Sequence, residues 1–247
     1  MKIYPFLLIF LLCICRNGGY AQETNSEWHF LIEPYLMFPG MKGETTIRQL
    51  PAAEVDAEAA DIFSYLKFGA MLYSEATNDN WTVSVDFIFM KLEQDAKANL
   101  LLLNGKISMN EMALEFAGIR RVAPWLDAGV AARILRLTAE IDLETIGDSH
   151  NGSSTKSWID PVIVLRSHGA IQKKWLLQLR GDFGGFGIGS DFTWQIQANV
   201  GYRFSKLFQT SVGYRVISID YDKGNGQDRF LYNINTFGPV LRFGVHL

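Results

Sequence analysis

Residues 191–221 read DFTWQIQANVGYRFSKLFQTSVGYRVISIDY, and apolar and polar side chains alternate along almost all of this stretch. A period of two is typical of a strand whose two faces meet different surroundings. A two-residue turn at Ser205-Lys206 separates two such strands. Before the turn one parity carries Trp194, Ile196, Ala198, Val200, Tyr202 and Phe204, and the other carries Gln195, Gln197, Asn199, Gly201 and Arg203; after it, Phe208, Thr210, Val212, Tyr214 and Val216 oppose Gln209, Ser211, Gly213 and Arg215.

The length of these strands is the second informative feature. A globular strand is typically about 5–6 residues long, whereas a strand that crosses a bilayer has roughly 9–11 tilted residues. In lipid, a closed barrel and an α-helix are the structures that satisfy their own backbone, and after the N-terminus the sequence has no run of the ~18 apolar residues that a membrane helix requires. The pattern therefore predicts an all-β, antiparallel, up-and-down transmembrane β-barrel.

The same alternation predicts ten strands, with eight or twelve as alternatives. Short connections alternate with longer polar ones, as expected for periplasmic turns and extracellular loops. An even strand count places both termini on the periplasmic side. The predicted strands are 27–38, 66–76, 81–91, 106–121, 125–138, 158–170, 174–183, 191–204, 207–219 and 230–247.

The N-terminus has the features of a secretory signal. Lys2 precedes an apolar run from Ile3 to Cys15, and Gly19-Tyr20-Ala21 places small residues where a signal peptidase cuts. We therefore expect residues 1–21 to be a signal peptide, residues 22–247 to be one barrel domain, and the protein to reside in a Gram-negative outer membrane. Both cysteines would be removed, which excludes disulfides from the mature chain.

Charge and histidine placement exclude other classes of protein. The chain has 23 Lys+Arg and 26 Asp+Glu; the signal carries Lys2 and Arg16 and no acid, which leaves 21 − 26 = −5. This balance gives no basic excess for nucleic acid. The histidines lie on separate elements without the short spacing of a zinc site, so we expect neither metal nor cofactor. The four are His29, His150, His168 and His246.

Parity also predicts which side chains enter the barrel. Charges of both signs can pair in a closed lumen, while tryptophans at strand starts are typical of an aromatic girdle at the membrane interface. The predicted girdle consists of Trp28, Trp81, Trp125, Trp158, Trp175 and Trp194. The predicted lumen network consists of Asp86, Glu115, Arg121, Asp127, Arg133, Asp160, Arg166, Arg180, Asp182, Arg203 and Arg215, with each carboxylate paired to an arginine.

A soluble barrel of the lipocalin type is the structural alternative, with its apolar face inward and its polar face outward. The charges favour the membrane form, because opposite signs neutralise one another inside a ring. Large outward aliphatic and aromatic faces in water are harder to explain.

Several local motifs resemble those of a family of small outer-membrane β-barrel proteins of Gram-negative bacteria, most of them uncharacterised. The motifs are Trp158-Ile159-Asp160-Pro161, Gly181-Asp182-Phe183-Gly184-Gly185-Phe186, Ser190-Asp191-Phe192-Thr193-Trp194-Gln195, the two Val-Gly-Tyr-Arg copies at 200–203 and 212–215, and Asp220-Tyr221. The resemblance covers residues 158–247; it implies fold and location and carries no catalytic residue. Leu247 departs from the aromatic residue that usually ends such barrels.

Function is less well marked. We expect a non-catalytic structural or interaction role, with outer-membrane lipid and the barrel-assembly machinery as partners. A narrow channel or small-solute binding barrel is the first alternative, and an outer-membrane hydrolase using loop residues is the second. The loop candidates are Asp142, Asp148, Ser149 and His150, with Asp191, Asp220 and Asp222 on neighbouring loops.

Three further segments are notable. Residues 184–189 are glycine-rich, but a phosphate-binding loop would precede a helix, and a strand is predicted to follow. Residues 55–63 have helical spacing and predict a short helix at the barrel rim. The loop that contains Leu100 to Leu103 would expose apolar surface, to lipid or to a partner.

Overall fold

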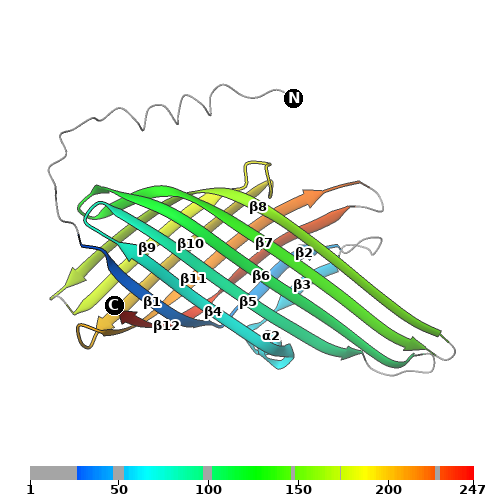
Figure 1. Ribbon diagram of the computed structural model, residues 1–247. Helices are drawn as coiled ribbons and strands as arrows, with labels where there is room; N and C mark the ends of the chain where they lie inside the picture. The colour runs from blue at the N-terminus through cyan, green and yellow to red at the C-terminus, as the bar shows by residue number, and fades with distance from the viewer. Residues whose placement is uncertain (1–26, 47–52, 97–101, 146–147, 173, 226–228) are drawn as a thin grey trace, which may run out of the picture.

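The computed structural model describes residues 27–46, 53–96, 102–145, 148–172, 174–225 and 229–247. Ten antiparallel strands form a closed barrel in the order β1-β4-β5-β6-β7-β8-β9-β10-β11-β12, and the pairing of β1 with β12 closes it (Figure 1). The predicted ten-stranded antiparallel barrel is confirmed. Its strands are β1 (His29–Met37), β4 (Leu66–Thr77), β5 (Trp81–Ala96), β6 (Leu102–Ala123), β7 (Leu126–Thr145), β8 (Asp148–Ile171), β9 (Trp175–Gly184), β10 (Phe192–Arg203), β11 (Phe208–Lys223) and β12 (Phe230–His246).

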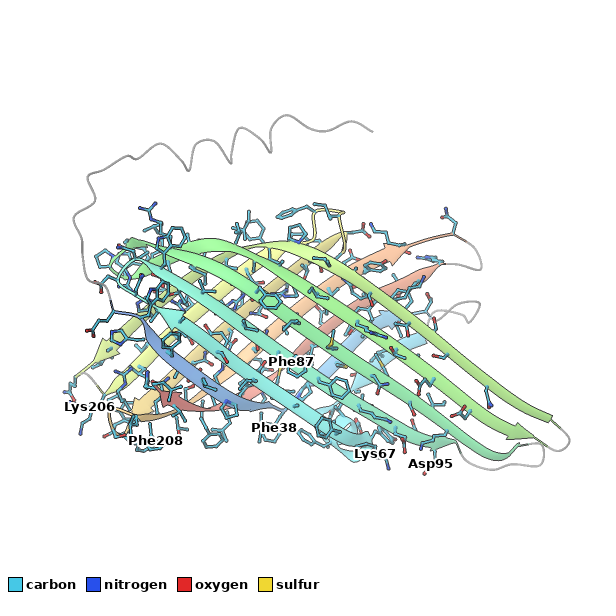
Figure 2. All side chains as sticks on the ribbon, viewed as in Figure 1. Phe38, Lys67, Phe87, Asp95, Lys206 and Phe208 are labelled. Carbon is cyan, nitrogen blue, oxygen red and sulfur yellow. The ribbon has the colours of Figure 1, made fainter. Side chains whose placement is uncertain are left out.

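The barrel has two distinct ends. The terminal end is where β1 begins and β12 finishes, next to the short turn between β10 and β11; the distal end is the opposite one. Figure 2 shows Lys206 and Phe208 toward the terminal end and Lys67 and Asp95 toward the distal end. That the terminal end faces the periplasm remains a prediction from the even strand count.

Two additional strands and a helix lie between β1 and β4, where the sequence predicted a loop. Strand β2 (Gly40–Thr45) continues the line of β1 along β12, and β3 (Ala53–Ala57) pairs with β2. Pro39 interrupts the line, because proline has no N–H to donate to a ladder. The helix predicted at 55–63 is present as α2 (Ala59–Tyr65); it begins later because residues up to Ala57 pair as β3.

Helix α2 lies beside the part of β4 that does not pair with β1. Strand β4 pairs with β1 only from Leu72 to Thr77, so its first residues pair with β5 alone within the described chain. Ile62 of α2 is buried in the apolar interior, and the ring of Phe63 lies 5.1 Å from that of Phe38. The helix therefore packs its apolar side against the barrel beside this change of pairing.

Four strands extend well beyond the predicted boundaries. The segments 139–145 and 148–157, predicted as parts of one loop, belong to a ladder in which β7 and β8 pair from Leu137 opposite Lys156 to Thr145 opposite Asp148. Strands β5 and β6 likewise pair as far as Ala96 and Gly105. The prediction was wrong here because a ladder with water on both faces needs no apolar alternation, and main-chain hydrogen bonds hold it. Figure 1 shows β6, β7 and β8 reaching past the other strands.

The outward faces of the strands are apolar. Side chains on the predicted outer parity are exposed, among them Val130, Ile159, Leu179, Ile196 and Val212. A surface of this size made of aliphatic and aromatic side chains is typical of contact with lipid. In the part of the chain that the structure describes, no helix has the length and apolar character to cross a bilayer.

Two neighbouring glycines on β6 and β7 provide a test of how closely these strands approach each other in the barrel wall. A Cβ at Gly129 would lie 2.1 Å from the carbonyl oxygen of Gly118 and 2.6 Å from Cα of Ile119, whereas a Cβ at Gly118 would meet nothing within 4 Å. We expect Gly129→Ala to destabilise the barrel by about 1–3 kcal/mol through this backbone clash. Gly118→Ala should be neutral. Heat-modifiable migration on a gel measures both, and equal behaviour of the two variants would contradict the proposed packing.

Candidate functional site

The middle of the barrel is crossed by a network of buried ions. Arg133 donates from Nε and Nη2 to Glu115 Oε2, at 2.9 and 2.7 Å, and from Nη2 to Asp182 Oδ1 at 2.8 Å. Arg180 binds the same two carboxylates, donating to Asp182 Oδ2 at 3.0 Å and to Glu115 Oε1. Guanidinium–carboxylate forks of this kind satisfy several polar atoms at once. The network joins β6, β7 and β9 through the lumen.

A second group of ions ties β1, β5, β10 and β11 together. Arg215 forms an ion pair with Asp86 at 3.0 Å and donates twice to Gln195 Oε1, at 2.9 and 2.7 Å. The hydroxyl of Tyr35 donates to Asp86 Oδ1 at 2.7 Å and accepts from Arg215 at 3.1 Å. All four side chains are buried, so the carboxylate and the guanidinium neutralise each other away from water.

A third group lies toward the terminal end. Arg166 donates to Asp127 at 2.8 Å, to Glu75 at 2.8 Å and to Thr82 at 3.0 Å. Tyr73 also donates to Glu75, at 2.7 Å. Sequence reasoning had placed Arg166 and Asp127 inside but had missed Glu75, although its parity on β4 is that of the inward-facing Tyr73.

Arg242 belongs to a fourth inward group and forms an ion pair with Glu33 at 3.3 Å. Its guanidinium carbon lies 5.0 and 4.9 Å from the ring centres of Tyr35 and Tyr73. Stacking of a guanidinium on two aromatic faces adds cation–π attraction. This residue therefore connects the second and third groups.

The predicted lumen residues can now be placed individually. Nine of the eleven are buried and belong to the contacts described here and in the next paragraph; Arg121 and Arg203 lie toward the mouth of the barrel and are more accessible. The buried nine are Asp86, Glu115, Asp127, Arg133, Asp160, Arg166, Arg180, Asp182 and Arg215.

Asp160 does not pair with an arginine, contrary to prediction. It lies opposite Arg133 in the ladder, yet its oxygens accept from Ser190 N at 2.6 Å, Ser190 Oγ at 2.7 Å and Trp158 Nε1 at 3.2 Å. Arg133 is occupied by other carboxylates, and three neutral donors satisfy Asp160 instead. A Cβ at Gly189 would lie 2.4 Å from Asp160 Oδ1, so the glycine allows this approach.

These bonds fix the glycine-rich segment 185–190 against the barrel. The turn uses positive φ angles at Gly185 (85°), Phe186 (49°) and Gly187 (74°), a region that favours glycine. It leads directly into strand β10, and a phosphate-binding loop would lead into a helix. The segment is therefore a tight turn held by Asp160.

Trp158 was assigned wrongly to the aromatic girdle. It is only 6% exposed, its Nε1 donates to Ser190 Oγ at 2.9 Å, and its ring lies 4.3 Å from that of Tyr221. Period two explains the error, because Trp158 shares its parity with the inward-facing Asp160. Trp28, Trp81, Trp125 and Trp175 are outward and 45–62% exposed, and Trp194 shares the outward parity of Ile196; their place at the membrane interface remains a prediction.

The distal half of the interior is mainly apolar, with Glu111 as an inward carboxylate at the cavity that borders it, and the predicted lumen network included neither. Leu135 and Leu137 share the inward parity of Arg133, so the signal was present in the sequence. A methionine-lined cavity of about 50 Å³ separates this half from the ions; it has room for only a few waters. The apolar cluster contains Met41, Ile62, Met90, Leu135, Leu137, Trp158, Ile219, Phe230, Tyr232 and Ile234.

The terminal end holds a cavity of about 560 Å³, called the vestibule here. Ligand pockets typically measure ~300–1,000 Å³. Its wall combines charged and amide side chains with backbone at two glycines. The lining includes Glu33, Tyr73, Glu75, Arg121, Arg166, His168, Gly169, Gln178, Asn199, Gly201, Arg203, Gln209, Ser211 and His246.

The residues of the hydrolase alternative are not assembled by what is described. The backbones of Asp142, Asp148, Ser149 and His150 belong to the extended β7–β8 ladder. The side chains of the last three lie outside the described part, as do residues Leu100 and Leu101. Asp191 pairs with Lys223 at 2.5 Å. Among the described residues no cluster of His, Cys, Asp and Glu could hold a metal ion.

The central ions generate a prediction about stability. Replacing Arg133 by methionine leaves Glu115 and Asp182 with one cation between them, and an unpaired buried charge costs about 3–5 kcal/mol. Arg133→Met should therefore lower the unfolding temperature of the heat-modifiable form. The control is Arg136→Met on the outward face of the same strand, where the side chain is exposed. Equal melting of the two variants would show that the lumen ions do not hold the barrel.

Asp160 generates a second prediction. Asp160→Asn replaces one acceptor oxygen by an NH2 group that faces donors, so the turn at 185–190 should loosen while the ladders persist. Limited proteolysis should then cut the variant near Phe186 faster than the wild-type protein. Asp191→Asn, next to the same turn but exposed, is the control. Unchanged cleavage in Asp160→Asn would mean that the turn is held by other contacts.

Comparisons with known proteins find solved structures at low sequence identity. No family model matches the chain, and no curated protein matches it. Solved structures that resemble it include OmpT, the outer membrane protease of Escherichia coli (11% identity, TM-score 0.47, 93% of this chain and 98% of that one), and Ail, the attachment invasion locus protein of Yersinia pestis (8%, 0.41, 89% and 98%). Neisserial surface protein A is another (12%, 0.31, 90% and 98%). No activity is carried over from them.

Proposed function

We propose that this protein is an integral outer-membrane β-barrel whose lumen is closed, with a non-catalytic structural or interaction role. The observation that carries the proposal is the filling of the interior by two successive layers. Buried ion pairs cross the middle, and an apolar cluster fills the distal half. Barrels of about eight strands are just filled by side chains, whereas open porins have 16 or more. Ten strands leave little bore beyond the space these side chains take.

The outer surface supports the membrane location. Exposed aliphatic and aromatic side chains cover the strands around the barrel, and lipid is the solvent that accommodates them. With residues 1–21 as a cleaved signal, the mature chain would reach the outer membrane through export and the barrel-assembly machinery.

The distal ladders support an interaction role. Strand β8 pairs with β7 from Asp148 to Ser167 but with β9 only from Val162 onward. Within the described chain its first residues thus have one unpaired edge, and free strand edges are surfaces to which partners add through main-chain hydrogen bonds.

Location can be tested by fractionation. The protein should remain with outer-membrane vesicles after a urea wash and begin at Gln22 by N-terminal sequencing. Release into buffer without detergent would contradict the membrane assignment and favour the soluble barrel.

Closure can be tested electrically. Purified protein in planar bilayers should give negligible conductance, because side chains of the ion and apolar layers occupy the bore in the described part of the chain. Steady, voltage-independent single-channel steps would favour the channel alternative. Hydrolysis of outer-membrane lipid or peptide, lost in His150→Ala, would favour the enzyme instead.

A further inference from the structure

One arginine of the vestibule, unlike the other two, has no carboxylate partner among the described residues. Arg166 binds Asp127 and Glu75, and Arg121 contacts Asp127 at 3.4 Å. Arg203, the last residue of β10, forms no ion pair among the described residues, and its buried Nε has no hydrogen-bond partner. It was predicted to pair with a lumen carboxylate, and that prediction was wrong.

A chain of hydrogen bonds explains why the neighbouring histidine does not accept a hydrogen bond from Arg203. The amide nitrogen of Gln209 donates to Glu33 at 2.8 Å, so its carbonyl oxygen faces His246 Nε2, also at 2.8 Å. That histidine nitrogen must then carry the proton and donate it to Gln209. It cannot accept from Arg203 Nη2, although the two nitrogens lie 3.4 Å apart.

In the other arginine–histidine contact of the vestibule, the histidine accepts the hydrogen bond and the arginine donates it. His168 Nδ1 lies 3.3 Å from Asp127 Oδ2 but has no hydrogen-bond partner among the described residues. Its Nε2 accepts from Arg121 Nη2 at 3.4 Å, because a guanidinium can only donate. Arg121 thus has both a carboxylate and an imidazole acceptor, while Arg203 has neither.

The carboxylates of the vestibule are also committed elsewhere. Glu33 accepts from Gln209 and Arg242, and Glu75 accepts from Tyr73 and Arg166. Neither is within ion-pair distance of Arg203 among the described contacts. Arg203 lines the vestibule, and a guanidinium at a preformed cavity without an internal carboxylate is the usual receptor for a forked oxyanion.

We propose that the vestibule binds a small molecule that carries an oxyanion, a carboxylate or a phosphate group, held by Arg203. The cavity of about 560 Å³ holds a molecule of drug-like size at most. Amide side chains elsewhere in the vestibule wall, Gln178 and Asn199, would supply further polar contacts for the rest of the ligand. Asn199 donates to Gln178 at 3.1 Å, which leaves the amide group of Gln178 available to donate.

The test uses the folded full-length chain in a non-ionic detergent. Sodium phosphate and sodium acetate are titrated calorimetrically against sodium chloride at equal ionic strength, and the two anions distinguish the two ligand sources. At least one should bind saturably beyond chloride. Arg203→Gln should weaken that binding by roughly tenfold or more, the share of a charge-assisted fork, and Arg203→Lys should retain part of it.

Arg121→Gln is the matched control, because it removes a cation of the same cavity that already has acceptors. It should change affinity by only about twofold, the effect of a screened charge at a distance. In buffer without either anion, Arg203→Gln should melt at or above the wild-type temperature, since it removes a cation without an acceptor.

Three results would overturn the proposal. One is the absence of saturable binding of both phosphate and acetate by the wild-type protein. Another is equal binding by Arg203→Gln. The third is a fall in melting temperature for Arg203→Gln as large as that for Arg133→Met, which would reveal an internal partner. None of these three results depends on the conductance of the barrel. The conductance experiment therefore tests the closed lumen independently of ligand binding.

Discussion

A guanidinium removed from water requires an acceptor for its N–H groups, and the interior of this barrel is organised by that requirement. Arg133 and Arg180 share Glu115 and Asp182, and Arg215 has Asp86 together with neutral acceptors. Together these contacts join β6, β7 and β9, and β5 with β11, through the lumen. Backbone ladders set the curvature of the wall, and these ions specify which walls face one another across the bore.

The same requirement explains the exceptions. Asp160 has no cation because Arg133 is already occupied, and it is satisfied by Ser190 and Trp158. A buried carboxylate bound by neutral donors keeps its charge only if those donors are fixed. The turn at 185–190 is consequently ordered by an acid in the barrel wall, and its glycines allow the close approach.

Much of the fold could be predicted from the sequence because membrane strands obey a strict two-residue period. The strand count and the inward placement of residues such as Arg215 follow from parity alone. The extended β7–β8 ladder could not be predicted, because side chains with water on both faces carry no periodic signal. Trp158 was misplaced although parity was sufficient, because its position at a strand start was given more weight than its shared face with Asp160.

The ion-pair partners of the lumen side chains could not be predicted from the sequence, for a different reason. Parity assigns a side chain to the lumen, but which carboxylate it meets depends on register and on distance across the bore. Asp160 accepts from neutral donors while Arg133 and Arg180 share two other carboxylates, so the pairing leaves one inward arginine without a carboxylate among the described residues. That residue is Arg203, at the wide mouth where water can still reach it. An unpaired cation costs least there, and there it also remains accessible to a ligand.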